Sequence, residues 1–178
     1  MSDAALARIS RETGRAMITL RGDLASRPLA SAVKRAVGQP VPGPRAILGD
    51  DDRAVAWMSP DELLILCPRG EAAGVSAGLS KALQGSFHLV ADVSDARAVF
   101  RIRGRGWREV LAKLTPADLS PAAFGEGELR RTRLAQVAAA FWTGGRDEAT
   151  LVCFASVADY VQALLENAAR PESAVGVL

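Results

Sequence analysis

The chain is poor in the residues that staple small proteins or bind metals, since its 178 residues include two cysteines and one histidine. Two cysteines cannot build a disulfide framework, and a lone imidazole is too little for most metal sites. Aromatic residues make up only 5%, and lysine is scarce because 19 of the 22 basic residues are arginine. With 20 acidic residues the formal charge is only +2. The composition therefore does not predict a nucleic-acid or membrane partner.

Long apolar runs are missing as well. Leu63–Cys67 is typical of the runs present, and it falls far short of the ~20 residues that cross a bilayer. The N-terminus has no basic segment followed by an apolar stretch, so no secretory signal is expected. Cys67 and Cys153 lie within apolar runs, which predicts reduced core thiols in a cytoplasmic protein.

What the sequence does contain is the pattern of a globular α+β protein. Apolar residues make up 49% and charged residues 24%, as in an ordinary soluble domain. Hydrophobic periodicity and turn residues predict the order β-α-β-β-β-α-β followed by β-α-β-β-α. The expected strands are 17–20, 46–48, 54–58, 62–67, 87–91, 97–103, 133–142 and 151–154, and the expected helices are 28–37, 75–83, 107–114 and 156–168.

Each half of this order resembles a split βαβ unit. We therefore expect an α+β fold made of two ferredoxin-like halves, with antiparallel sheets that carry helices on one face. The chain, residues 1–178, is expected to form a single domain with pseudo-halves at about 15–92 and 93–170.

Several polar motifs have an ordinary structural interpretation. The acidic run Asp50–Asp52 lies at a predicted hairpin tip, where aspartate accepts turn dihedrals and stays hydrated, so an ion cage is the weaker interpretation. His88 lies in a strand and is expected to be structural. The sequence Gly104-Arg105-Gly106 precedes a helix like a phosphate-binding loop, but Glu109 stands where the third glycine would be. A tight turn that needs glycine is the favoured interpretation.

Arginine gathers on one predicted strand, because Arg97, Arg101 and Arg103 alternate with Ala98, Phe100 and Ile102. The basic side is compatible with a solvated face, with a protein interface in which arginine pairs with carboxylates, or with nucleic-acid binding. No residue is predicted to be catalytic or to bind a cofactor or metal. The predicted subunit interface is Arg97, Arg101, Arg103, Trp107, Arg130, Arg131 and Thr132.

Four blocks, in order, cover about residues 46–166 and resemble one family. The first is Trp57-Met58-Ser59-Pro60-Asp61-Glu62 with the apolar strand after it, and the second is Asp92-Val93-Ser94-Asp95-Ala96-Arg97, followed by Gly104. Their order and spacing are similar to the gamma subunit family of heterotetrameric sarcosine oxidase. The other two blocks are Leu111, Leu114, Pro116, Asp118, Leu119, Pro121, Phe124, Gly127, Arg131, Thr132 and Leu134, then Ser156, Ala158, Asp159 and Tyr160.

The resemblance implies an accessory chain without a cofactor of its own, with alpha, beta and delta subunits as partners. It implies that their complex oxidises sarcosine to glycine, formaldehyde and hydrogen peroxide, or forms methylenetetrahydrofolate when tetrahydrofolate is present. FAD, FMN and NAD are implied for the alpha and beta subunits, and zinc for the delta subunit. The implied location is cytoplasmic.

The family's fold is similar to the folate-binding region of the aminomethyltransferase of the glycine cleavage system. Five residues resemble the strand-helix block of that wider superfamily: Asp92, Ser94, Gly104, Leu111 and Asp118. A counterpart of the segment that carries that enzyme's catalytic aspartate is missing from this sequence. Two alternatives therefore stay open beside the sarcosine oxidase subunit: a gamma subunit of an N-methylglutamate dehydrogenase-type complex, and a stand-alone folate-binding one-carbon protein.

Overall fold

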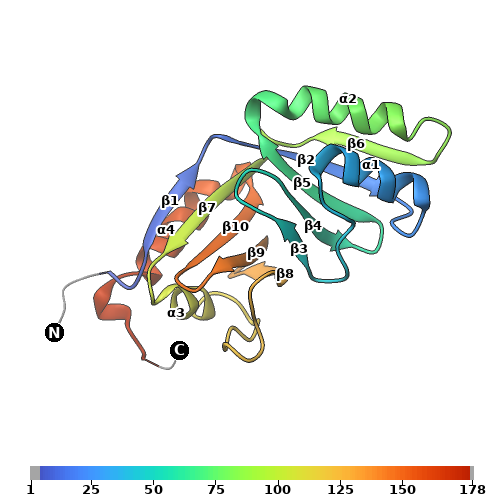
Figure 1. The fold of residues 1–178 in the computed structure, drawn as a ribbon. Helices are drawn as coiled ribbons and strands as arrows, with labels where there is room; N and C mark the ends of the chain where they lie inside the picture. Colours follow the sequence, from blue (N-terminus) through green and yellow to red (C-terminus); the bar gives the residue numbers. More distant parts are fainter. Residues whose placement is uncertain (1–4, 177–178) are drawn as a thin grey trace. The chain divides into compact units, whose positions relative to one another are not determined.

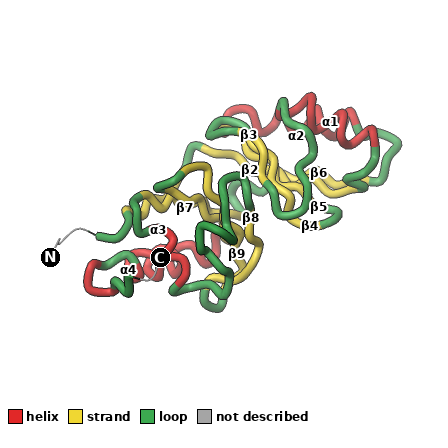
Figure 2. The backbone as a smooth tube through the Cα atoms, turned by 60° about the horizontal axis from the view of Figure 1, so that its bottom comes forward, coloured by secondary structure: helices red, strands yellow, loops and turns green. Residues whose placement is uncertain are grey.

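The computed structural model describes residues 5–176 and divides the chain into two compact units. The central unit is Gly14–Asp95, and the terminal unit combines Met1–Thr13 with Ala96–Leu178. Each unit contains one five-stranded antiparallel sheet. Figures 1 and 2 show helices packed on the sheet of each unit. The predicted α+β fold with two ferredoxin-like halves is therefore confirmed.

In the central unit, helices α1 (Arg27–Val37) and α2 (Ala72–Ala82) lie next to each other over the sheet (Figure 1). Helix α1 has Pro28 in its first turn and ends at Gly38, whose φ of 80° closes the helix in the left-handed region. The 3-10 turn Arg69–Glu71 leads into α2. The strands in spatial order are β3 (Ile47–Gly49), β4 (Ala54–Ser59), β5 (Glu62–Pro68), β2 (Arg15–Gly22) and β6 (His88–Asp92).

The core of the central unit lies between these helices and the sheet. In β2 and β5 the alternate residues Ile18 and Leu20 stand opposite Ile65 and Leu63, and all four side chains join the core cluster. Every residue of β5 from Glu62 to Cys67 is buried, which explains why this strand reads as a continuous apolar run rather than an alternating one.

The terminal unit is built in the same way from both ends of the chain. Helices α3 (Trp107–Ala112) and α4 (Ala158–Ala168) pack on its sheet, with 3-10 turns at Ala155–Val157 and Pro171–Ser173. Residues 113–128 form a loop from α3 to the next strand. The strands in spatial order are β1 (Arg8–Glu12), β7 (Arg97–Arg103), β10 (Glu148–Phe154), β9 (Val137–Gly145) and β8 (Leu129–Leu134).

Two sequence predictions in the terminal unit need correction. Strand β1 was not expected, because its residues are mostly polar and exposed; the structure pairs it with β7 in an antiparallel ladder. The single strand expected over 133–142 is wrong, since β8 and β9 are separate strands joined by a reversal at Ala135. Ala135 has a φ of 50°, so this turn occurs without the glycine that usually marks one.

The Gly104-Arg105-Gly106 segment is the tight turn that the sequence favoured. Gly104 has a φ of 137°, and the backbone N–H of Gly106 donates to the carbonyl of Leu6 at 3.1 Å. A Cβ on Gly106 would lie 2.8 Å from that same oxygen. The glycines therefore allow the N-terminal segment to pass close to the start of α3, and no phosphate-binding role is needed to explain them.

Candidate functional site

The arginine strand β7 has the alternation that the sequence predicted, with Ala98, Phe100 and Ile102 in the core. The basic side is not a row of free charges. Arg101 donates from Nε to Glu12 Oε1 at 2.8 Å and from Nη1 to Glu148 Oε1 at 3.3 Å. The second oxygen of Glu148 accepts from Nε of Arg103 at 3.0 Å. Charges from three adjacent strands thus alternate in sign across this face and compensate one another.

Two residues of the predicted interface are inside the molecule. Arg101 is only 4% exposed and Trp107 is fully buried, its indole Nε1 donating to the carbonyl of Arg146 at 3.0 Å. Neither side chain is therefore exposed on the surface of this chain, and their place in a subunit interface stays a prediction. Arg97 is half-buried, with its guanidinium 5.2 Å from the ring centroid of the exposed Phe154, and Arg103 is exposed.

The second predicted cluster lies on β8, an edge strand of the terminal sheet. Arg131 is exposed, whereas Arg130 and Thr132 are half-buried. The guanidinium of Arg130 stacks 5.0 Å from the ring centroid of Phe124 and forms an ion pair with Glu128 at 3.3 Å. Because β8 is an edge strand, one row of its backbone groups has no neighbouring strand in this sheet.

Phe124 brings together residues that are far apart in the sequence. Its ring contacts Trp107 and Phe141 edge-to-face, with centroid separations of 6.2 and 5.6 Å. The guanidiniums of Arg108 and Arg130 both approach this ring. The loop 113–128 is therefore held to the sheet by an aromatic core with two cations over it.

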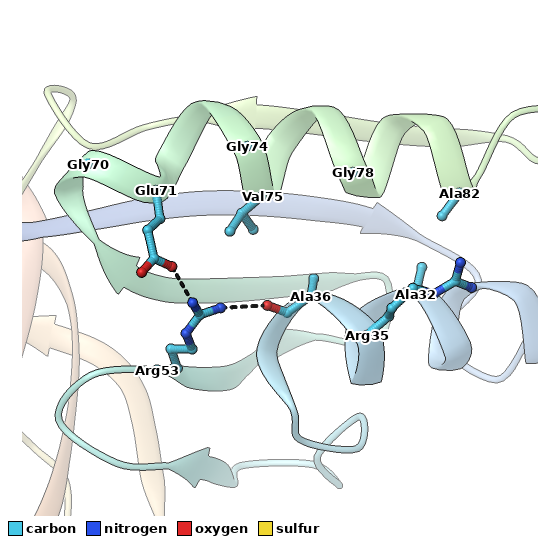
Figure 3. Close-up of a pocket in the computed structure, with 10 residues that line it drawn as sticks. All are labelled: Ala32, Arg35, Ala36, Arg53, Gly70, Glu71, Gly74, Val75, Gly78 and Ala82. Carbon is cyan, nitrogen blue, oxygen red and sulfur yellow. Dashed lines mark hydrogen bonds and ion pairs between the residues drawn. The ribbon is translucent and has the colours of Figure 1, made fainter.

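A cavity of about 430 Å³ lies between α1 and α2 in the central unit, and the sequence analysis did not predict it. Figure 3 shows Ala32 and Ala36 of α1 facing Gly74, Val75 and Gly78 of α2 across this space. The small residues at 70, 74, 78 and 82 recur every four positions, the helical spacing that was the available signal. Arg53 closes one end, bound to Glu71 and, at 3.1 Å, to the carbonyl of Ala36 (Figure 3).

The family-like motifs act as structural turns. Ser59 Oγ donates to Asp61 Oδ1 at 2.5 Å within the β4–β5 hairpin. Asp92 accepts from both the backbone N–H and the hydroxyl of Ser94, which hold the pKa of Asp92 below its usual range, the hydroxyl most strongly. Ser94 Oγ in turn accepts from the N–H of Met17 at 2.9 Å, which fixes the end of β6 against β2.

The acidic hairpin tip is also a turn. Asp50 Oδ1 accepts from the backbone N–H groups of Arg53 and Asp52, each at 2.9 Å, and these bonds lower the pKa of Asp50. This is the bonding of an Asx turn, in agreement with the hydrated tip that the sequence predicted.

Groups that carry redox or nucleophilic chemistry are dispersed and protected. Cys67 and Cys153 are buried free thiols, and burial raises the pKa of both, that of Cys153 to about 11. His88 is half-exposed with Nδ1 2.8 Å from the carbonyl of Ser86. Within residues 5–176, no three His, Cys, Asp or Glu side chains gather as a metal site would require. Across the same residues, the helices are too short or too polar to traverse a bilayer.

Residues 21–171 match the model of the family described as "Sarcosine oxidase, gamma subunit family". The chain belongs to the sarcosine oxidase gamma subunit family. A family relative from Corynebacterium sp. strain P-1, a sarcosine oxidase subunit gamma, is 32% identical over 148 residues, covering 79% of this chain and 72% of the relative. The subunit gamma of Arthrobacter sp. is 39% identical over 92 residues, which are 52% of this chain and only 44% of that relative.

Solved structures agree with this membership. A chain of the heterotetrameric sarcosine oxidase from Corynebacterium sp. U-96, in complex with pyrrole 2-carboxylate, matches with a TM-score of 0.87 and 27% identity, covering 100% of this chain and 90% of that one. The aminomethyltransferase T of the glycine cleavage system from Bartonella henselae matches with a TM-score of 0.64 and 18% identity over 92% of this gamma-family chain and 46% of the enzyme. The second likeness is one of fold. The sequence resemblance to the gamma subunit family is thus confirmed, and the aminomethyltransferase match shows a shared fold.

Proposed function

We propose that this chain is the accessory gamma subunit of a heterotetrameric sarcosine oxidase, which oxidatively demethylates sarcosine to glycine. The observation that carries the proposal is the structural match to a chain of such a complex, with a TM-score of 0.87 over all of this chain and 90% of that one. A match that includes nearly the whole of both chains supports a shared place in an assembly, because an accessory subunit is defined by its whole surface rather than by a small catalytic site.

The chemistry of the described residues suits an accessory role. Both thiols are buried with raised pKa values. Within residues 5–176, no three His, Cys, Asp or Glu side chains gather as ligands of a metal ion. We therefore assign FAD, FMN, NAD, zinc and tetrahydrofolate to the alpha, beta and delta subunits. Hydrogen peroxide with formaldehyde, or methylenetetrahydrofolate, would be the products of those subunits. We expect assembly in the cytoplasm, where thiols such as these stay reduced.

The predicted subunit interface keeps its exposed and half-buried members. Arg103 and Arg131 lie at the surface, and Arg97, Arg130 and Thr132 are half-buried beside them in the sheet. Arg101 and Trp107 would support this surface from within rather than contact a partner. Arg131 on the edge strand β8 and Arg103 on the inner strand β7 both suit a polar rim around a subunit contact.

Co-expression with the alpha, beta and delta subunits, followed by size-exclusion chromatography and a peroxidase-coupled sarcosine assay, tests the function. We expect the four chains to elute together and to produce hydrogen peroxide, and we expect the three other chains to yield less intact complex without this one. Elution of this chain alone, while the others assemble and turn over sarcosine normally, would contradict the proposal.

The same preparation separates the two alternatives. Parallel assays with sarcosine and N-methylglutamate identify the substrate of the complex. Calorimetry of the isolated chain with tetrahydrofolate tests the stand-alone folate-binding reading, which the aminomethyltransferase likeness supports at the level of fold. Submicromolar binding by the isolated chain would favour that alternative over the accessory role.

A further inference from the structure

Arg108 is held in one orientation by its own unit. It is the second residue of α3, and its guanidinium carbon lies 4.4 Å from the centroid of the Trp107 ring and 6.0 Å from that of Phe124. Nη1 donates to two backbone carbonyls, those of Leu119 at 2.7 Å and Phe124 at 2.9 Å. Stacking and the two hydrogen bonds together fix the plane of the guanidinium and leave its opposite edge, Nε with Nη2, facing away from these carbonyls.

No carboxylate of residues 5–176 pairs with Arg108. Burial lowers the pKa of Arg108, and no acidic neighbour offsets that effect. Three other half-buried or buried arginines each have such a partner: Arg53 has Glu71, Arg130 has Glu128, and Arg101 has two. A guanidinium stays protonated in proteins, so Arg108 is a partly desolvated positive charge without a counter-charge in the described part of the chain.

The surroundings of Arg108 are those of a binding hot spot. Tryptophan and arginine are enriched among residues whose loss weakens protein–protein binding, and such residues sit against well-packed neighbours. Trp107 and Phe124 provide that packing, and both are fully buried. The free Nε and Nη2 groups of an arginine point in parallel, which matches the two oxygens of a carboxylate.

We propose that Arg108 is a docking residue that receives an aspartate or glutamate side chain of a larger partner subunit, a role that rests on the proposed function. The carboxylate would bind side-on to Nε and Nη2, completing the hydrogen bonds of the guanidinium and neutralising its charge. The partner's acidic residue would thus sit beside the loop 113–128, near Arg130 on the edge strand β8. Preorganisation by the two carbonyls and the rings favours this contact, because little side-chain entropy is lost on binding.

The variant Arg108→Lys tests the role. An ammonium keeps the charge and can donate to the same carbonyls, but it lacks the two parallel N–H groups that grip a carboxylate. We expect about tenfold weaker retention of this chain in the co-expressed complex, measured by titrating the purified variant back into a preparation of the other three subunits. The midpoint of thermal unfolding of the free variant should stay close to that of the wild type. Arg27→Lys is the matched control, since Arg27 is exposed at the start of α1.

Zero-length carbodiimide coupling then identifies the partner group. It joins an amine to a nearby carboxylate with loss of water, so the amine introduced at position 108 should cross-link to an Asp or Glu of a partner subunit, whereas that at position 27 should not. Equal retention of wild type and Arg108→Lys would overturn the docking role and leave the accessory function intact. Failure of the wild type itself to join the complex would overturn both.

Discussion

Arg101 and Arg108 of the terminal unit show two different environments for a guanidinium removed from water. Arg101 lies on the inner strand β7, is 4% exposed, and bonds to Glu12 and Glu148 from the strands on either side. The guanidinium of Arg108 stacks on an aromatic ring and donates to two backbone carbonyls, and no carboxylate of the described chain pairs with it. The charge of Arg101 is compensated within the fold, whereas that of Arg108 has no carboxylate among residues 5–176, and we propose that a partner subunit supplies it.

The comparison separates residues that stabilise the chain from residues that the chain holds ready. Removing one member of a buried ion pair should lower the stability of the fold strongly, because the charge that remains is no longer compensated. A residue whose partner lies outside the chain should matter to assembly more than to folding. Three substitutions extend this test from the largest expected effect to the smallest.

Arg101→Ala should destabilise the free chain by about 3 kcal/mol, because it removes the cation that Glu12 and Glu148 share in a partly buried site and leaves Glu148 with Arg103 alone. These side chains are 26% and 27% exposed, so water can only partly replace the guanidinium. Urea unfolding followed by tryptophan fluorescence measures the loss. Arg103→Ala is the control: its side chain is 59% exposed, and it should cost no more than about 1 kcal/mol. Equal losses in the two variants would contradict the buried network.

Glu109 adjoins Arg108 in the sequence, but like Arg101 it has its bonding partners within the chain and should stabilise the fold. It is 5% exposed and accepts from the backbone N–H groups of Val175 at 2.6 Å and Gly176 at 3.0 Å. Lys113 lies 3.4 Å away as an ion-pair partner. These bonds, that of Val175 above all, hold the pKa of Glu109 below its usual value of 4.5. Glu109→Gln should therefore cost about 2 kcal/mol near neutral pH, since an amide has only one acceptor oxygen for the two donors.

The pH dependence has a defined sign. A carboxyl whose pKa is lower in the folded state contributes its stability above the unfolded pKa and loses it as the pH falls through the folded value. The difference between wild type and Glu109→Gln should be complete above about pH 5 and shrink on further acidification. Urea midpoints between pH 7 and pH 3 measure this, with Glu126→Gln as the exposed loop control. A difference that does not change over this range would argue against an ionised Glu109.

Much of the fold could be predicted because local pattern and packing agree. The burial of strand β5 is indicated by its continuous apolar run. The buried face of helix α1 is indicated by Leu29, Val33 and Val37 at helical spacing. Strand β1 could not be predicted, because it is polar and becomes a strand only through its ladder with β7. The reversal at Ala135 was hidden for a similar reason, since tertiary pairing of β8 with β9 holds an alanine at a positive φ.

The environment of the arginines was beyond the reach of the sequence. Arg101 is 89 residues from Glu12 and 47 from Glu148, so no local spacing indicates their contact. The motif blocks were informative because each is a compact turn with its own hydrogen bonds, such as Ser94 with Asp92. Local signals therefore identified the family, while the choice between a paired and an unpaired guanidinium depended on the three-dimensional fold.

The smallest expected effect on stability concerns Gly78 in α2. It lies in the interior of the helix beside the cavity, and a Cβ built on it meets no atom within 4 Å. Because nothing in the described chain requires its small size, Gly78→Ala should stabilise the free chain by about 1 kcal/mol through helix propensity. Gly106→Ala is the opposite case, since its Cβ would lie 2.8 Å from the carbonyl oxygen of Leu6 and should destabilise the chain. Thermal unfolding of the two variants should therefore shift in opposite directions, and a loss of stability in Gly78→Ala would mean that this glycine is needed for packing within the fold.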